Sequence, residues 1–391
     1  MTDTPILSGN WNYPTSVRFG AGRIKELPKC CKNLGMTKPL IITDPGLAKL
    51  PMIGEAQTIN NDAGLPTTIF SNIKSNPVGR NITDGLRAFH EGGHDGVIAF
   101  GGGSAMDAAK TIAFMAGQKR PLWDFEDVGD NWKRAELDAI APVVAVPTTS
   151  GTGSEVGRAT VVIDEETETK KVLFHPRMLP ELVICDPELV TGLPPHITAA
   201  TGMDALAHCL EAFCVNGYHP MADGIALEGM RLVRDWLPTA VKDGTNIEAR
   251  AHMMAAAAMG ATAFQKGLGA IHSLSHPVGA VFDTHHGLTN AVFMPYVMVF
   301  NRKAIKDKMQ LLARFIGLEY PSFEAVLGWT LDLRDQFDLP HTAAELGVAE
   351  DRLSDIADMA AKDPTAPTNP IEAGPKEMRA MLDAAMEGTL G

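Results

Sequence analysis

The pattern of hydrophobic and polar positions changes near the middle of the chain. In the first half, short runs of apolar and β-branched residues recur between longer stretches of helical composition, and most runs are bounded by Gly, Pro or Asp. These runs cover residues 40–43, 96–100, 143–146, 159–163 and 182–185. Runs of this length and composition are typical of buried strands. Strands that alternate with helices predict a mostly parallel sheet with helices on both faces.

The second half has a different texture. After Pro194, Ala, Leu and Met dominate and β-branched runs become scarce. The stretch at 249–264, ARAHMMAAAAMGATAF, is a strong helix former by intrinsic propensity. We therefore predict an α/β domain over residues 1–190 and an all-helical domain over residues 191–391. The chain then closes with a long loop at 363–375 and a terminal helix.

Composition narrows the class of protein. The chain has 45% apolar and 21% charged residues, values of an ordinary globular protein that exclude long disorder. It lacks a run of about 18 apolar residues, and its first residues lack the basic start and apolar core of a secretory signal. A net charge of −13 argues against nucleic acid and membranes as partners. Five cysteines without a CxxC pair predict reduced thiols and a cytoplasmic location.

Two glycine-rich segments follow predicted strands. Residues 96–110, GVIAFGGGSAMDAAK, run from a strand through three glycines and Ser104 into a helix. Glycines allow a close backbone approach, and the N–H groups at a helix start attract phosphate. Residues 147–155, PTTSGTGSE, follow the next predicted strand. Each segment alone could be a tight turn or a solvated loop, but two such strand exits in one sheet favour a shared nucleotide.

Asp44 ends the strand segment LIITD. A carboxylate at that place can accept both ribose hydroxyls of an adenosine and would repel a 2′-phosphate. In the usual dinucleotide fold the acid follows the glycines, whereas Asp44 precedes Gly101, so the topology must differ. From position alone, a local role as the cap of a following helix is equally favoured.

Two further segments carry metal-type side chains. In TGMDALAHCLEAF, Asp204, His208 and Glu211 are spaced i, i+4 and i+7, which places them on one helix face among apolar neighbours. In GAIHSLSHPVGAVFDTHHG, His272 and His276 lie on a helix that we expect to end before Pro277.

The second segment holds four of the 12 histidines of the chain. His285 and His286 follow His276 by two to three helical turns. Together with the Asp-x3-His pair, this density predicts a divalent metal site, for which one carboxylate and imidazoles suit Zn(II) or Fe(II). A nucleotide and a Lewis-acidic metal suggest hydride transfer at a carbonyl group.

The chain resembles the iron-containing (group III) alcohol dehydrogenase family over nearly its whole length. The resemblance rests on FGGGSAMDAAK, PTTSGTGSE, ICDPELVTGLPPHITAATGMDALAHCLEAF and GAIHSLSHPVGA. It implies an N-terminal Rossmann-like α/β domain and an all-α C-terminal domain, with the active site between them, an architecture shared with dehydroquinate synthase. It further implies oxidation of a small alcohol or reduction of an aldehyde, with NAD and Fe(II) as cofactors. Use of NADP and of Zn(II) stays open.

The resemblance also assigns roles to residues. It implies a metal held by Asp204, His208, His272 and His286. It implies a proton-relay or substrate-orienting role for His276. It implies cofactor contacts for Asp44, Asn76, Gly101, Gly102, Gly103, Ser104, Asp107, Thr148, Thr149, Thr152 and Lys170. The last metal ligand usually follows a proline, but here His285 precedes His286, so His285 remains a neighbouring candidate.

Three alternatives stay in view. One is a metal-independent enzyme of the maleylacetate reductase type, which lacks the full ligand set present here. Another is an enzyme of the glycerol-phosphate or dehydroquinate synthase type, which would need cationic groups for a substrate phosphate. The third is a non-catalytic protein that binds nucleotide or metal on the same scaffold. The resemblance also implies a homodimer or a larger homo-oligomer.

Overall fold

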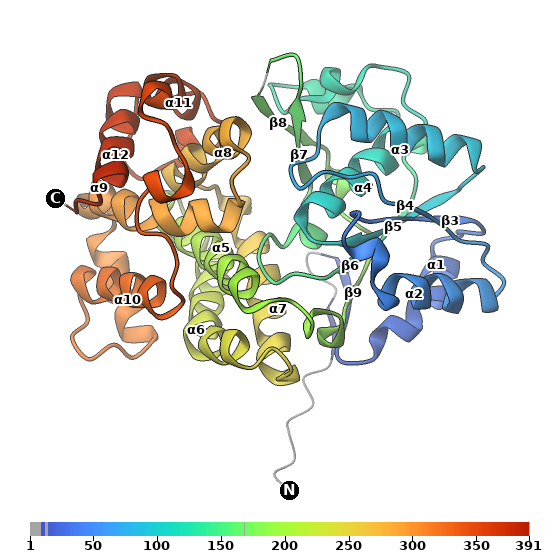
Figure 1. Cartoon of the computed structure of the whole chain (residues 1–391), viewed down its shortest axis with the longest axis horizontal. Coiled ribbons are helices and arrows are strands. Elements are labelled where there is room, and N and C mark those ends of the chain that lie inside the picture. Colours follow the sequence, from blue (N-terminus) through green and yellow to red (C-terminus); the bar gives the residue numbers. More distant parts are fainter. Residues whose placement is uncertain (1–8, 12–14, 168, 391) are drawn as a thin grey trace, which may run out of the picture. The chain divides into compact units, whose positions relative to one another are not determined.

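The computed structural model describes residues 9–11, 15–167 and 169–390. The chain divides into two compact units, each of which combines several segments (Figure 1). The first unit contains the residues up to Thr149, Gly153–Gly192 and Thr245–Met254, and the second contains Ser150–Thr152, Leu193–Gly244 and the residues from Ala255 onwards. Every strand among the described residues belongs to the first unit.

A seven-stranded sheet forms the centre of the first unit, in the order β1-β2-β9-β6-β5-β3-β4. Its strands are β1 (Gly9–Trp11), β2 (Ser16–Phe19), β3 (Pro39–Ile42), β4 (Thr68–Phe70), β5 (Gly96–Gly101), β6 (Val143–Pro147) and β9 (Leu182–Cys185). Only β1 and β2 pair antiparallel; the other neighbours in this sheet are parallel. The predicted parallel α/β architecture is therefore confirmed.

Strands β3, β5, β6 and β9 are buried along their whole length. Burial on both faces explains why these segments are continuous apolar runs and do not alternate with polar residues. Helices α1 (Leu27–Asn33) and α2 (Pro51–Asp62) share one hydrophobic core with these four strands. Helices α3 (Gly79–Glu91) and α4 (Gly103–Met115) pack together, and α4 also packs on β5 and β6.

The strand predicted at 159–163 forms, but it lies outside the parallel sheet. It is β7 (Ala159–Asp164), which pairs antiparallel with β8 (Thr169–Phe174) in a separate two-stranded sheet. The connection between the two strands is short. A short connection permits a hairpin, whereas parallel neighbours need a crossover of a dozen or more residues.

The second unit is helical. Its helices are α5 (Pro195–Cys214), α6 (Pro220–Lys242), α8 (Ala270–Phe282), α9 (His286–Phe315), α10 (Phe323–Gln336), α11 (Leu353–Ala361) and α12 (Pro375–Glu387). The helix predicted at 249–264 is α7 (Ile247–Ala263), whose residues are divided between the two units. Helix α5 is buried almost throughout, because most of its residues are either apolar or small, such as Ala, Gly, Cys and Thr, and allow close helix packing.

The histidine-rich segment departs from its predicted structure. Helix α8 continues through Pro277, so the prediction that it ends before this proline is wrong. Proline removes one backbone donor and crowds the preceding turn, but the buried side chains of α8 hold it in helical form. The helix ends at Asp283, whose φ of 53° is left-handed. His285 and His286 therefore do not extend the first helix, because His286 begins α9.

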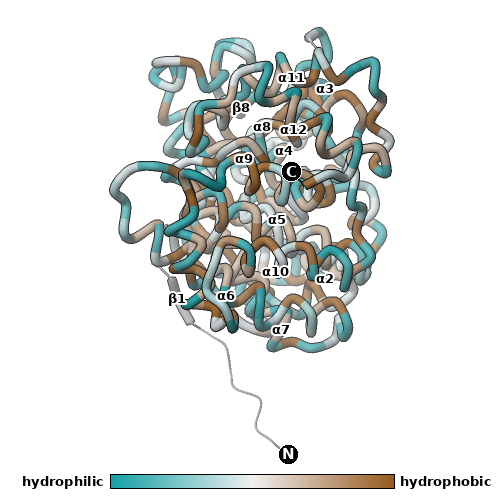
Figure 2. The backbone as a smooth tube through the Cα atoms, turned by 90° about the vertical axis from the view of Figure 1, so that its left-hand side faces the viewer, coloured by the Kyte–Doolittle hydropathy of each residue, from teal (hydrophilic) through white to brown (hydrophobic). Residues whose placement is uncertain are grey.

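Hydrophilic and hydrophobic residues alternate in short groups along the helices (Figure 2). Across the described residues, none of the helices has both the length and the hydrophobicity that crossing a membrane would require. All five cysteines are buried.

Candidate active site

The first glycine-rich segment forms the turn from β5 into α4. Gly101 has a φ of 156°, and a Cβ atom at this position would lie 2.7 Å from the Cβ of Ala105. Gly102 precedes the first residue of α4, and no side chain caps the helix there. The first N–H groups of a helix have no partners within the helix. The turn therefore presents backbone donors where a phosphate can bind.

The second glycine-rich segment lies directly beside the first. The backbone N–H of Thr148 donates to the carbonyl oxygen of Gly101 over 3.0 Å. A Cβ atom on Gly102 would lie 3.1 Å from Cγ2 of Thr149. Thr148 is buried and Thr149 is half-buried. Thr152 follows in the short segment that groups with the second unit.

Asp44 has the local capping role that the sequence left open. Its Oδ1 atom accepts hydrogen bonds from the backbone N–H groups of Gly46 and Leu47, at 2.8 and 3.0 Å, so it caps the turn after β3. Its Oδ2 atom lies 3.9 Å from the place that a Cβ atom of Gly101 would take. The carboxylate is half-buried beside the first glycine-rich turn.

Ser104 connects the start of α4 to the loop that contains Asn76. Its hydroxyl donates to the carbonyl oxygen of Ser75. Asn76 is half-buried in that loop. The structure thus brings the Ser-Asn-Pro segment to the same turn as the glycines.

The side chain of Asp107 faces the interior of the unit, and both of its carboxylate oxygens are hydrogen-bonded to groups of the protein. Its carboxylate accepts hydrogen bonds from Ser154 Oγ at 2.5 Å and from the N–H of Val161 at 2.9 Å. Burial raises the pKa of Asp107, while the nearby Lys110 and Lys170 side chains act against this rise. The hydrogen bond from Ser154 thus fixes the end of the second glycine-rich segment to Asp107 on α4.

The buried Lys110 completes this support. Its Nζ atom donates to the carbonyl oxygens of Ser154, Gly157 and Ala159, at 2.9, 3.2 and 2.8 Å, and lies 3.8 Å from Asp107 Oδ1. Burial lowers the pKa of Lys110, against the attraction of Asp107. These bonds fix the backbone that follows the second glycine-rich segment. The sequence gives one signal for this residue, its position three residues after Asp107 on the same helix.

The four predicted metal ligands come together in the second unit. Asp204 and His208 lie one turn apart on α5, His272 lies in the first turn of α8, and His286 is the first residue of α9. One ligand atom from each residue lies within 4.8 Å of all the others. The side chains of Asp204, His208 and His272 are buried, and that of His286 is 26% exposed.

The donor atoms suit a divalent cation. Asp204 Oδ1 lies 3.9 Å from His208 Nε2 and 3.6 Å from His286 Nε2. Burial lowers the pKa of His208 to about 4, so this imidazole is neutral, the form that binds metals. The His208 and His272 rings stack, with their centroids 4.7 Å apart. One carboxylate and three imidazoles are ligands that Fe(II) and Zn(II) accept.

Asn290 lies among these ligands, and the sequence motifs did not predict it. Its Nδ2 atom lies 2.8 Å from Asp204 Oδ1, 3.3 Å from His272 Nε2 and 3.2 Å from His286 Nε2. Among the described residues, its buried Oδ1 atom has no hydrogen-bond partner. Buried polar atoms without partners are costly, which fits a site built to hold an ion. The available signal was the i, i+4 spacing from His286.

His276 lies beside the cluster without belonging to it. Its ring centroid is 5.6 Å from that of His286 and 5.8 Å from that of His272. Its Nδ1 atom is 2.8 Å from Asp363 Oδ2. The other oxygen of Asp363 accepts from the N–H and the hydroxyl of Thr365, at 2.9 and 2.6 Å.

These contacts set the charge of Asp363. Burial alone would raise the pKa of this carboxyl group, but His276 and the Thr365 hydrogen bonds hold the pKa below its ordinary value. An ionised Asp363 orients the imidazole of His276. The sequence held no signal for this pair, because Asp363 lies in the loop before α12, far from His276 along the chain.

His285 is the residue before α9 and lies outside the group of four. Burial lowers its pKa. The structure therefore brings His286 to the other ligand atoms and leaves His285 as a neighbour.

Solved structures and curated proteins that are similar to this chain include several dehydrogenases. The crystal structure of 1,3-propanediol oxidoreductase is similar with a TM-score of 0.90 and 32% identity, over 98% of this chain and 100% of that chain. The 4-hydroxybutyrate dehydrogenase of Cupriavidus necator is 38% identical, over 96% of this chain and 99% of the relative. The NAD-dependent methanol dehydrogenase of Bacillus methanolicus is 32% identical, over 96% and 100%. The class is thus an alcohol-type oxidoreductase.

Family models specify the class further. Residues 14–187 match the model described as iron-containing alcohol dehydrogenase. Residues 198–386 match the C-terminal model of the Fe-containing alcohol dehydrogenase family. The chain belongs to the iron-containing alcohol dehydrogenase family, as its motifs predict.

Proposed function

We propose that this chain interconverts a small alcohol and its aldehyde, with NAD as the hydride carrier and a divalent metal at Asp204, His208, His272 and His286. The observation that carries the proposal is the buried group of one carboxylate and three imidazoles. We assign Fe(II) as the ion, with Zn(II) as the second candidate, because the donor set suits both and the family is described as iron-containing. The completeness of this set argues against a metal-independent reductase.

A divalent ion at this place would supply Lewis acidity toward a substrate oxygen. The protein groups orient the reaction and move the proton. The Asp204 carboxylate would offset one unit of the charge of the ion, and the three imidazoles, which bind metals in the neutral form, would offset none, so the site would stay electropositive. His276, oriented by Asp363 through Nδ1, can exchange a proton with the substrate hydroxyl through Nε2.

The two glycine-rich segments and their neighbours bind the nucleotide. The turn from Gly101 to Ser104 receives the pyrophosphate at the start of α4. The remaining nucleotide contacts are those that the family resemblance implies, made by Thr148, Thr149, Thr152, Asn76 and Lys170. Asp44 accepts the ribose hydroxyls and repels a 2′-phosphate, so NAD is preferred over NADP. In the reductive direction a bound NADH would supply the hydride for the carbonyl carbon, and His276 would supply the proton for the oxygen.

The substrate class that we propose comprises short primary alcohols, diols and hydroxy acids, together with the corresponding aldehydes. The names of the relatives, which include a hydroxybutyrate, a methanol and a propanediol enzyme, support this range. We also propose a cytoplasmic location, in keeping with the buried thiols, and a homodimer or a larger homo-oligomer.

The test is NADH oxidation with a panel of short aldehydes and hydroxyaldehydes. The protein is purified without oxygen, and one half is loaded with Fe(II) while the other is stripped with a chelator. Turnover that is lost on stripping and restored by Fe(II) is expected. Unchanged turnover after verified loss of metal would refute the metal-dependent reaction. No turnover with both NADH and metal bound would favour the non-catalytic alternative.

A further inference from the structure

Glu211 touches the group of ligands without being one of them. It lies on α5, one turn beyond His208, and is 5% exposed. Both of its carboxylate oxygens are engaged at the start of α8. Oε2 accepts from Nδ1 of His272 at 2.6 Å, and Oε1 accepts from the backbone N–H of Ile271 at 2.7 Å. One carboxylate thus joins the helix of two ligands to the helix of a third.

The bond from His272 to Glu211 decides which ring nitrogen faces the cluster. A carboxylate accepts hydrogen bonds, so Nδ1 of His272 carries a proton and donates it. This arrangement leaves the lone pair for metal binding on Nε2, the atom that lies 3.3 Å from Asn290 Nδ2 among the ligands. Carboxylates in this position fix the orientation of metal-binding histidines and increase their basicity.

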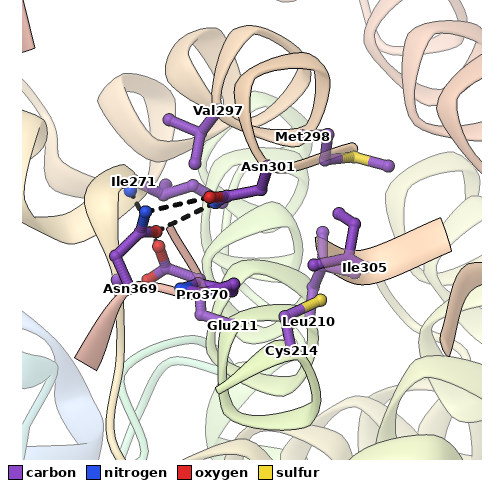
Figure 3. Close-up of a pocket in the computed structure, with 11 residues that line it drawn as sticks. Leu210, Glu211, Cys214, Ile271, Val297, Met298, Asn301, Ile305, Asn369 and Pro370 are labelled. Atoms are coloured by element: carbon purple, nitrogen blue, oxygen red, sulfur yellow. Dashed lines mark hydrogen bonds between the residues drawn. The ribbon is translucent and has the colours of Figure 1, made fainter. Parts of the chain in front are cut away.

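A second polar group holds the same helix start. Asn369 Oδ1 accepts from the backbone N–H of Ala270 at 3.1 Å and from Asn301 Nδ2 at 2.9 Å. In return, Asn369 Nδ2 donates to Asn301 Oδ1 at 2.9 Å. Figure 3 shows this amide pair beside Glu211 around a small cavity. Asn301 belongs to α9, so the start of α8 is bonded to both other helices that carry ligands.

The space around these groups leaves little freedom. A Cβ atom on Gly269 would lie 2.8 Å from Asn369 Oδ1 and 3.0 Å from Glu211 Oε1. The backbone at Gly269 therefore approaches both acceptors closely, and the first turn of α8 has one well-defined place.

We propose that Glu211 is a positioning residue of the metal site. Glu211 holds His272 so that Nε2 faces the other ligands. This inference rests on the proposed function, because it requires a metal at that cluster. In the Glu211→Gln variant, one carboxylate oxygen is replaced by an NH₂ group. The side chain then has a single acceptor oxygen for two donors, the N–H of Ile271 and the Nδ1–H of His272. When the NH₂ group faces His272, it favours the ring form with the proton on Nε2, which blocks ligation.

The experiment measures the affinity of the metal-free protein for Zn(II) by competition with a chelator. We expect binding by Glu211→Gln to be about 10- to 100-fold weaker than by the wild type. The matched control is Lys308→Met. Lys308 donates to the carbonyl oxygens of Phe213, Cys214 and Val215 at the end of α5. Its loss should lower the thermal midpoint of the metal-free protein but change the Zn(II) affinity by no more than about twofold.

Equal affinity of Glu211→Gln and wild type would overturn the inference, and so would an equal loss of affinity in the Lys308→Met control. Failure of the wild type to bind Zn(II) or Fe(II) would instead overturn the proposed function. If Glu211→Gln does not fold, NMR spectra of the Zn-loaded wild type labelled with ¹⁵N-histidine test the inference instead. A downfield proton on Nδ1 of one metal-bound histidine, assigned to His272, supports the inference, and its absence overturns it.

Discussion

Glu155 is a buried carboxyl group at the end of the second glycine-rich segment, and its replacement by glutamine should change how stability depends on pH. The residue is 4% exposed. Burial raises its pKa to about 7, against the attraction of Lys110, from an ordinary value of 4.5. The folded protein therefore binds the proton of Glu155 more tightly than the unfolded chain does.

The sign follows from this difference. Between pH 4.5 and about pH 7 the unfolded chain releases the proton first, so the free energy of unfolding falls as the pH rises. The shift corresponds to about 3 kcal/mol once both states are deprotonated. Glutamine keeps the shape but has no proton to release. The Glu155→Gln variant should match the wild type near pH 4.5 and exceed its stability by up to about 3 kcal/mol at pH 8.

Urea unfolding of the metal-free protein at several pH values measures the effect. The control is Glu166→Gln, at an exposed position in the hairpin of the same unit, which should leave the pH dependence of the wild type unchanged. Parallel pH profiles for the wild type and Glu155→Gln, or a less stable variant at pH 8, would refute the reasoning.

Four other substitutions test the nucleotide site and the metal site separately. Gly101→Ala places a Cβ atom against Ala105 and should weaken NADH binding at least about tenfold without loss of metal, which fluorescence titration and metal analysis together would check. Asp44→Asn removes the charge that opposes a 2′-phosphate, so the ratio of kcat/KM for NADH over NADPH should fall; an unchanged ratio would exclude Asp44 from cofactor choice. His286→Ala should lose most bound metal while His285→Ala retains it, and full retention in the first variant would contradict the ligand assignment.

Several features of the molecule could be predicted because local patterns control them. Strands β3, β5, β6 and β9 are buried on both faces, and this burial is visible as continuous apolar runs. The pairs Asp204 with His208 and His272 with His276 follow from helical spacing. The glycines at the end of β5 mark a turn in which a side chain would collide, as the 2.7 Å approach to Ala105 confirms.

Other features depend on contacts between distant segments. The pairing of Asp363 with His276 joins a late loop to α8, and no spacing rule connects them. His286 reaches the ligand cluster because Asp283 ends α8 in a left-handed conformation, which a count of helical turns did not include. Tertiary packing overrides the helix-breaking tendency of Pro277. Helical spacing placed Glu211 on the same helix face as Asp204 and His208. Its hydrogen-bond partners, His272 and Ile271, lie on another helix and could not be predicted from spacing.

We propose above that one metal ion binds to the cluster of four residues in the second unit. Crystals of the protein loaded anaerobically with Fe(II), measured on both sides of the iron absorption edge, would locate this ion. We predict an anomalous peak about 2.1 Å from a carboxylate oxygen of Asp204 and from one nitrogen each of His208, His272 and His286. A peak held by other residues, or no peak in crystals of fully loaded protein, would show that these four residues do not form the metal site.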